Sequence, residues 1–173
     1  MQTEQGSIED IVASYGEKLL RYATSILYSH QDAEDIVQDA LIAYHQKSNK
    51  LEISNISAWL YKVTYNLCLD KIKAKKRRRL SFFEDIKQEP AVYMEDTLSM
   101  PEMMKALEAL SPADRALLYG RIIDGQSYKE LSRIMGISEP NLRKQYERAK
   151  NKAAKLLNAS GYGLVDTSYV PNV

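Results

Sequence analysis

The sequence predicts an all-α protein of two small helical domains joined by a flexible acidic linker, with a helix-turn-helix in the second domain. Apolar residues recur at helical spacing, and no segment alternates as a strand does. Only 7 Gly and 5 Pro occur among 173 residues, which also favours helix. The charges fall into three blocks: residues 1–79 carry 12 basic and 10 acidic side chains, residues 80–102 carry 1 and 6, and residues 103–173 carry 11 and 7. This basic–acidic–basic layout is typical of two folded parts and a linker.

The first domain, residues 1–79, is predicted to begin with two helices. Ser7, with Asp10 three residues later, has the pattern of a helix N-cap, and apolar residues follow at helical spacing. A second helix is expected from near Asp32 to about Lys47. One face of this second helix is apolar and is expected to be buried; it consists of Ala33, Ile36, Val37, Ala40, Leu41 and Tyr44.

The opposite face of the second helix is an acidic stripe that holds Asp32, Asp35 and Asp39. DNA phosphates would repel these side chains, so the stripe is not expected to bind nucleic acid. The stripe is either an acidic face in contact with solvent, where Asp32 is favoured near the helix N-terminus, or a surface that binds a basic region of another protein. Considered alone, the stripe is better interpreted as a face in contact with solvent.

A third helix is expected from about Ile56 into the basic segment "KIKAKKRRR", residues 71–79, in which seven of the nine residues are Lys or Arg. Four of its side chains are expected to face the core: Leu60, Val63, Thr64 and Leu67. The opposite face is expected to present a row formed by Trp59, Lys62, Asn66 and Lys73, with Tyr65 and Leu69 beside it. An aromatic ring, cations and an amide in one exposed row suit single-stranded nucleic acid, because rings stack on bases and Lys binds phosphate. The alternative is that Trp59 packs in the core, but the basic segment favours nucleic acid.

Residues 80–102 are predicted to be the linker, because the helical periodicity fades there and Pro90 and Pro101 interrupt it. At the other end of the chain, residues 159–173 are expected to form a loop or a loosely docked tail.

The second domain, residues 103–158, shows start and stop signals for three helices. Ser111 is followed by Pro at the first helical position, which is a helix start. Ser127 and Glu130 have the spacing of a capping box for the next helix, and Gly136 is expected to end it. A short helix, a turn at a Gly and a further helix is the helix-turn-helix pattern.

The last helix is amphipathic. At helical spacing its apolar face holds Leu142, Tyr146, Ala149, Ala153 and Leu156. Its other face is polar and mostly basic, with Asn141, Arg143, Lys144, Glu147, Arg148, Asn151 and Lys155. Such a helix fits the major groove of DNA, where Arg, Lys and Asn reach base edges or phosphates. A solvated basic face is the alternative; the capping box, the Gly turn and the basic face together favour DNA.

Several classes of protein are not expected. No run of about 18 apolar residues occurs, so no membrane insertion is predicted, and the polar N-terminus does not read as a signal peptide. We therefore expect a cytoplasmic protein. Cys68 is the single cysteine, and His30 and His45 are isolated, so neither a metal site nor a cofactor site is indicated. Without a Gly-rich phosphate loop either, an enzyme with a small-molecule substrate is not expected.

Three segments, in order, resemble bacterial sigma factors of the extracytoplasmic-function (ECF) type: "DAEDIVQDAL", "WLYKVTYNLCLDKIKAKKRRR" and "LSPADRALLYGRIIDGQSYKELSRIMGISEPNLRKQYERAKNKAAKLL". The resemblance covers about residues 8–157. It implies two helical domains that bind core RNA polymerase and direct it to promoter DNA, and it implies an anti-sigma factor as a further partner.

The resemblance also implies residue roles. The first segment would dock on the clamp helices of the polymerase beta-prime subunit, through Asp32, Asp35, Gln38 and Asp39. The second would bind the minus-ten strand, where a base is flipped out, through Trp59, Lys62, Asn66 and Lys73. The third would read the minus-thirty-five element as duplex, through Asn141, Arg143, Lys144, Glu147, Arg148 and Asn151. The acidic linker would thread the RNA-exit region of the polymerase.

The chain departs from the family pattern at two places. Members often carry Gly-Thr-Val where this chain has Pro140-Asn141-Leu142, and Glu147 stands where an aromatic or neutral residue occurs. Base preference therefore does not carry over from the family.

The second hypothesis is a free-standing helix-turn-helix regulator that binds a palindromic operator as a dimer. It leaves the acidic stripe and the Trp59 row unexplained.

Overall fold

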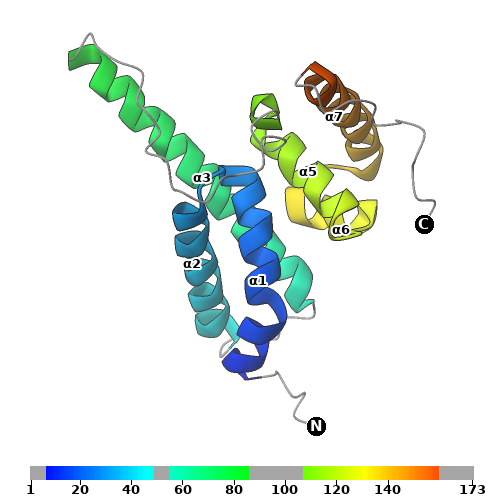
Figure 1. Ribbon diagram of the computed structural model, residues 1–173. Coiled ribbons are helices and arrows are strands. Elements are labelled where there is room, and N and C mark those ends of the chain that lie inside the picture. Colours follow the sequence, from blue (N-terminus) through cyan, green and yellow to red (C-terminus); the bar gives the residue numbers. More distant parts are fainter. Residues whose placement is uncertain (1–6, 49–54, 86–106, 160–173) are drawn as a thin grey trace. The chain divides into compact units, whose positions relative to one another are not determined.

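The computed structural model describes residues 7–48, 55–85 and 107–159 (Figure 1). These residues belong to two compact units, one within Met1–Asp96 and the other within Thr97–Val173. All elements in the described part of the chain are helices, which confirms the predicted fold class. None of these helices is both long and apolar enough to pass through a membrane.

The first unit begins with a hairpin of two helices, α1 (Ile8–Leu27) and α2 (His30–Ser48). The predicted cap of α1 is confirmed as a capping box: the Asp10 N–H donates to Ser7 Oγ at 3.3 Å, and the Ser7 N–H donates to Asp10 Oδ2 at 3.0 Å. Tyr28 ends α1 in the left-handed region, with φ 52°. This tight turn brings the acidic N-terminus of α2 directly after α1.

The third helix, α3 (Ile56–Asp85), packs against both helices of the hairpin. It has 30 residues, against 20 in α1 and 19 in α2. At 1.5 Å per residue it is about 15 Å longer than either. Its C-terminal part therefore continues past the hairpin, as the green end of the helix does in Figure 1.

The buried face of α3 differs from the one predicted. Leu60 and Thr64 are buried as expected, but Val63 and Leu67 are only half-buried. Tyr65, expected beside the exposed row, is buried. The buried face consists of Leu60, Tyr61, Thr64, Tyr65 and Cys68. The reason is that α3 lies between two helices, where the rings of the two tyrosines bury more surface than smaller side chains would.

α3 also remains helical from Leu80 to Asp85, inside the segment predicted to be linker. The remaining linker residues, 86–102, lie outside the described residues, as do residues 160–173 of the predicted tail.

The second unit contains a short 3₁₀ helix, η1 (Leu107–Ala109), and three α-helices, α5 (Pro112–Ile122), α6 (Tyr128–Met135) and α7 (Glu139–Ala159). Its predicted signals are confirmed. Ser111 caps α5 by accepting from the Asp114 N–H at 3.1 Å. Ser127 and Glu130 form a complete capping box for α6. Gly136 ends α6 at φ 70°, a backbone conformation that favours Gly.

The core of the second unit lies where α5, α6 and α7 meet. Its fully buried side chains include Leu117 of α5, Leu131 of α6 and Leu142 of α7. Gly120 makes this close packing possible, because a Cβ there would lie 2.5 Å from Gln126 Oε1 and 2.9 Å from Cδ2 of the buried Leu131. The three helices thus hold α6, the Gly136 turn and α7 in a fixed helix-turn-helix.

Candidate functional site

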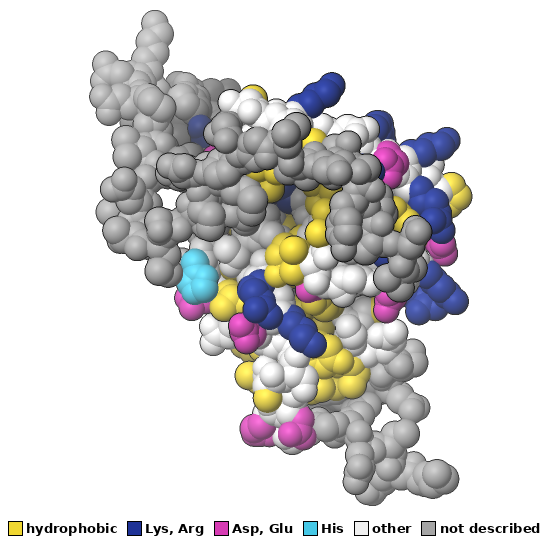
Figure 2. Space-filling view, turned by 45° about the vertical axis from the view of Figure 1, so that its right-hand side comes forward, with side chains coloured by type: hydrophobic (Ala, Val, Ile, Leu, Met, Phe, Trp, Pro, Cys, Tyr) yellow, Lys and Arg dark blue, Asp and Glu magenta, His cyan; other side chains and the backbone are white. Residues whose placement is uncertain are grey.

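α7 presents one polar face to solvent. The six residues predicted to contact duplex DNA are all exposed: Asn141, Arg143, Lys144, Glu147, Arg148 and Asn151. The apolar face is buried at Leu142, Tyr146 and Ala149, as predicted, but Ala154 rather than Ala153 continues it. Figure 2 shows one face of the molecule, on which Lys and Arg side chains project with Asp and Glu among them. On α7 itself, Glu147 stands among Arg143, Lys144 and Arg148, so its exposed face is basic without being uniformly so.

Arg143 is held by contacts that the sequence pattern did not reveal. Its guanidinium carbon lies 4.4 Å from the centre of the Tyr128 ring, and its Nη2 lies 3.7 Å from Glu139 Oε2. Arg121 lies over the same ring at 5.0 Å and donates from Nη1 to the Gln126 carbonyl at 3.1 Å. The Tyr128 ring, at the start of α6, thus gathers two guanidinium groups beside the helix-turn-helix. Sequence reasoning missed Tyr128 and Arg121, because the helical pattern of α7 does not report contacts from α5 and α6.

The charges farther along α7 are only partly neutralised. Glu147 pairs with Lys150, with Oε2 and Nζ 3.0 Å apart. Gln145 points to α5 instead and donates from Nε2 to Asp114 Oδ1 at 2.9 Å. Within the described residues, Lys144 and Arg148 have no carboxylate at ion-pair distance. Two cations of α7 therefore remain available to phosphates.

The row predicted on α3 is present in part. Lys62, Asn66 and Lys73 are exposed, and the Lys73 Nζ lies 3.6 Å from Asp70 Oδ1. Trp59, expected in the exposed row, is half-buried, because its ring packs edge-on against Tyr44 of α2 with 5.9 Å between centres. Lys47 Nζ lies 5.8 Å from the Trp59 ring centre. Trp59 thus has both a packed and an accessible side.

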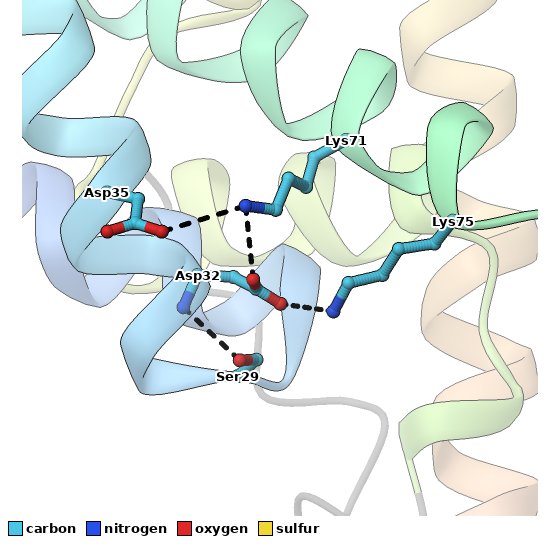
Figure 3. A network of polar contacts seen from close by, with 5 residues as sticks. All are labelled: Ser29, Asp32, Asp35, Lys71 and Lys75. Atoms are coloured by element: carbon cyan, nitrogen blue, oxygen red, sulfur yellow. Dashed lines mark hydrogen bonds and ion pairs between the residues drawn. The ribbon is translucent and has the colours of Figure 1, made fainter. Parts of the chain in front are cut away.

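The acidic stripe of α2 is divided. Asp35, Gln38 and Asp39 are exposed, but the side chain of Asp32 is only 15% exposed, and it turns to α3 (Figure 3). Asp32 Oδ1 lies 3.2 Å from Lys71 Nζ, and its Oδ2 accepts a hydrogen bond from Lys75 Nζ.

These contacts change the acidity of Asp32. Burial of the carboxyl opposes its ionisation, but hydrogen bonds from Lys75, Ser29 and Lys71 outweigh burial and hold the pKa below the ordinary value of 3.8. The prediction that Asp32 shares the solvent-facing stripe is therefore corrected. The helical pattern gives only the side of α2 on which Asp32 lies. The direction of its carboxylate is determined by Lys71 and Lys75 of α3.

An apolar groove lies beside the exposed part of the stripe. It has a volume of about 580 Å³ and lies between α1 and α2. Val12 of α1 and Ile42 of α2 line it and are nearly half exposed, at 46% and 47%. Gln38 borders it, so the apolar groove and the polar part of the stripe form one continuous surface. Sequence reasoning missed this groove, because it placed Leu41 in the core and did not consider Ile42.

The described residues contain neither a metal-ligand cluster nor an exposed thiol. No group of three or more His, Cys, Asp or Glu side chains there is placed to hold a metal ion. Burial raises the pKa of Cys68 to about 12, which keeps the thiol protonated and unreactive at neutral pH. His30 lies at the start of α2, with Nε2 3.3 Å from Glu34 Oε1.

Two family models match the chain. Sigma-70 region 2 matches residues 11–78, and Sigma-70 region 4 matches residues 101–152. Together these ranges cover more than half of the 173 residues.

Curated relatives agree with the family models. The chain is 25% identical to the ECF RNA polymerase sigma factor SigE of Mycolicibacterium smegmatis over 159 residues, covering 87% of this chain and 62% of SigE. It is also 25% identical to the ECF RNA polymerase sigma factor SigM of Bacillus subtilis over 159 residues, covering 88% of this chain and 96% of SigM. The chain thus spans less than two thirds of SigE and nearly all of this SigM.

Solved structures share the fold. The sigma factor RpoE from Bartonella quintana, in complex with the anti-sigma factor NepR, matches with a TM-score of 0.71 and 25% identity, over 87% of this chain and 96% of RpoE. CnrH, in complex with the cytosolic domain of CnrY, matches in fold with a TM-score of 0.66 and 22% identity, over 88% of each chain. From both family models, the named relatives and these structures, we conclude that the chain belongs to the ECF-type sigma factors of RNA polymerase.

Proposed function

We propose that this protein binds core RNA polymerase and directs it to specific promoters. In this proposal α7 reads the upstream element as duplex, and α3 captures the melted minus-ten strand. The observation that carries it is the exposed polar face of α7 within a fixed helix-turn-helix. A single helix of this kind offers few base contacts, each worth about 1–3 kcal/mol. A second reading unit on the same chain adds discrimination, because linked binding events reinforce one another.

The polymerase-docking surface in this proposal is the exposed part of α2. Asp35, Gln38 and Asp39 supply its polar contacts, and the apolar groove next to Gln38 supplies buried area. The clamp helices of the beta-prime subunit are the proposed occupant. Acidic side chains around an apolar centre favour a partner that carries basic residues around an apolar anchor. Asp32, predicted to belong to this surface, is not among its exposed side chains, because its carboxylate turns to Lys71 and Lys75 of α3.

The minus-ten surface in this proposal is the exposed side of α3. Asn66 would hydrogen-bond the edge of an extruded base, since its amide offers both a donor and an acceptor. Lys62 and Lys73 would hold phosphates, and the accessible side of Trp59 would border the base.

The upstream surface in this proposal is the exposed face of α7. Arg143 is the leading candidate for a base contact, because the Tyr128 ring and Glu139 already restrict its guanidinium. A restricted side chain loses less conformational entropy on binding. Lys144 and Arg148 would contact phosphates, and Asn141, Glu147 and Asn151 complete the face.

Further properties are proposed with this function. The chain would act as a specificity subunit without catalysing a reaction or using a cofactor, and it would work in the cytoplasm, where the polymerase is. Residues 1–79 would form the polymerase and minus-ten domain, 80–102 the linker, 103–158 the upstream domain and 159–173 a tail. An anti-sigma factor is a proposed partner, since the similar sigma factor RpoE was solved in complex with the anti-sigma factor NepR. A free-standing dimeric regulator is not favoured, because the family match includes the first unit.

The test is in vitro transcription with core polymerase on a library of genomic fragments, with start sites mapped. The wild-type protein is expected to direct starts at promoters that share two spaced elements, whereas Arg143→Ala is expected to relax preference at one upstream position. Arg21→Ala is the matched control, because Arg21 also pairs with a Glu four residues earlier and is similarly exposed, at 58% against 61%. If core polymerase gains no promoter-specific starts with the wild-type protein, the proposed function is wrong.

A further inference from the structure

We propose that Asp32 is a positioning residue that ties α3 to α2 and so fixes the direction in which the basic end of α3 projects. This role differs from the polymerase contact that its place in the acidic stripe suggested. Figure 3 shows the arrangement: the Asp32 carboxylate lies between Lys71 and Lys75, and Asp35 lies on the far side of Lys71. We call Asp32, Lys71 and Lys75 the α2–α3 tether.

The tether joins two helices at two points. Lys71 and Lys75 are four residues apart, so they rise from adjacent turns of α3, about 6 Å apart along its axis. Both ammonium groups bind the same carboxylate, Lys71 at Oδ1 and Lys75 at Oδ2. Lys71 also lies 3.7 Å from Asp35 Oδ2. Two attachment points on one anchor oppose both rotation and tilting of α3, which a single ion pair would not do.

The anchor itself is fixed. Ser29 Oγ accepts from the backbone N–H of Asp32 at 3.3 Å, and the carboxylate lies in the first turn of α2, where the helix dipole favours negative charge. The Asp32 side chain is 15% exposed and that of Lys71 is 28% exposed, so solvent screens this pair less than it screens an open surface pair.

Two other ion pairs of the first unit are of a different kind. Arg21–Glu17 and Lys73–Asp70 each lie within one helix, and both partners in each are more than half exposed. Such pairs stabilise a helix locally and do not orient one helix against another. The position of the tether between two helices is therefore what assigns it a role in geometry.

The tether lies at a point of α3 where a small change of helix direction has a large effect on the end of the helix. Lys75 is followed by a run of exposed residues, 76–80, and α3 continues to Asp85. The tether thus lies where α3 leaves the hairpin, and a small change of angle there displaces the end of the helix by a larger distance. Lys76 and Arg77 lie on this projecting part, so the tether determines where these cations stand.

The consequence for function rests on the proposed function. α2 carries the proposed polymerase-docking surface, and α3 carries the proposed strand-binding surface. A tether between them keeps one surface at a fixed distance and angle from the other. Without it, polymerase docking would persist, while the basic end of α3 would meet the promoter in a range of orientations. The defect would then fall on promoter opening and not on polymerase affinity.

The first experiment measures the geometry in the isolated protein. Spin labels are placed at exposed positions through Gln46→Cys on α2 and Arg79→Cys on α3, and their distance distribution is measured by double electron–electron resonance. Cys68 can stay, because it is fully buried and its pKa is raised to about 12. Asp32→Asn, which keeps the size and removes the charge, is expected to broaden the distribution. Asp32→Glu, which keeps the charge, is expected to leave it close to wild type.

Asp70→Asn is the matched control, because it removes an exposed pair within α3 and is expected to change nothing. Circular dichroism at the measuring temperature verifies that each variant is folded. If Asp32→Asn leaves the width of the distribution unchanged, the tether is refuted, whatever the protein does in transcription.

The second experiment measures function with core polymerase and unlabelled full-length variants. At equal polymerase occupancy, Asp32→Asn is expected to form about tenfold fewer open complexes, since small misplacements of a binding group reduce rates strongly. Asp32→Glu is expected to restore opening. Normal opening by a variant with a broadened distance distribution would refute the functional half of the proposal. If the wild-type protein itself supports no promoter opening, the proposed function fails, and the distance measurement still decides the tether alone.

Discussion

The substitution Asn66→Ala tests whether Asn66 binds the melted minus-ten strand or stabilises the fold. Asn66 is exposed on α3, between the buried positions Thr64 and Cys68 on the other side of the helix. Within the described residues its amide has no hydrogen-bond partner. Removal of the amide therefore takes no hydrogen bond from the described part of the folded protein.

The expected magnitudes differ sharply between folding and function. An exposed substitution of this kind changes the free energy of unfolding by less than about 0.5 kcal/mol, and Ala is the better helix former. A two-bond contact with a base is worth about 1–3 kcal/mol. Its loss should lower promoter opening by about 5- to 150-fold. Polymerase affinity should stay unchanged, because Asn66 does not lie on α2.

The assay is permanganate reactivity of thymines across the start region, with wild type and variant at equal polymerase occupancy. A second template that is already mismatched open should recover much of the activity of the variant. Asn158→Ala serves as a matched control, since it removes an exposed amide from a helix of the other unit. Asn66→Asp should be worse than Asn66→Ala, because it adds a negative charge facing the strand.

Two results would refute this reasoning. Normal opening of the closed template by Asn66→Ala would show that no base contact is made there. A lowered melting temperature of the variant would show that Asn66 stabilises the fold instead.

Three further predictions concern the other surfaces and the core. Asp35→Lys with Asp39→Lys should weaken core-polymerase binding about tenfold or more at low salt and less at high salt, with helical content unchanged; equal affinity in a pull-down titration would contradict the docking surface. Gly120→Ala should destabilise the second unit by about 1–2 kcal/mol in thermal unfolding, because overpacking against Leu131 outweighs the better helix propensity of Ala; a stabilised variant would contradict this. Because its pKa is lowered in the folded protein, ionised Asp32 stabilises the fold at pH values above the pKa that it has in the unfolded chain. This stabilisation is lost as the pH falls through the pKa of Asp32 in the folded protein, so the melting temperatures of wild type and Asp32→Asn should converge in acid. A difference in melting temperature that stays constant with pH would argue against the tether.

The sequence determined the helices and those of their ends that a cap or a Gly turn marks, because these signals are local; the C-terminal end of α3, which has no such signal, was not predicted. A cap such as Ser7 or Ser127 bonds a backbone group three residues away, and the Gly136 turn depends on the backbone of one residue. The exposed face of α7 was also predictable, since a helix with one buried side must expose the other. The resemblance to ECF sigma factors was readable for the same reason: its motifs are contiguous segments.

The tertiary structure decided which side of α3 is buried and which charges meet. Tyr65 is buried because α3 packs between two helices, and the helical period alone cannot give the width or the direction of a face that two neighbours share. Arg143 lies over a ring from α6, and Lys75 bonds Asp32 across 43 positions of sequence. Such pairs form only when packing brings distant segments together, so the charges of an isolated helix do not reveal whether they face solvent, a partner or one another.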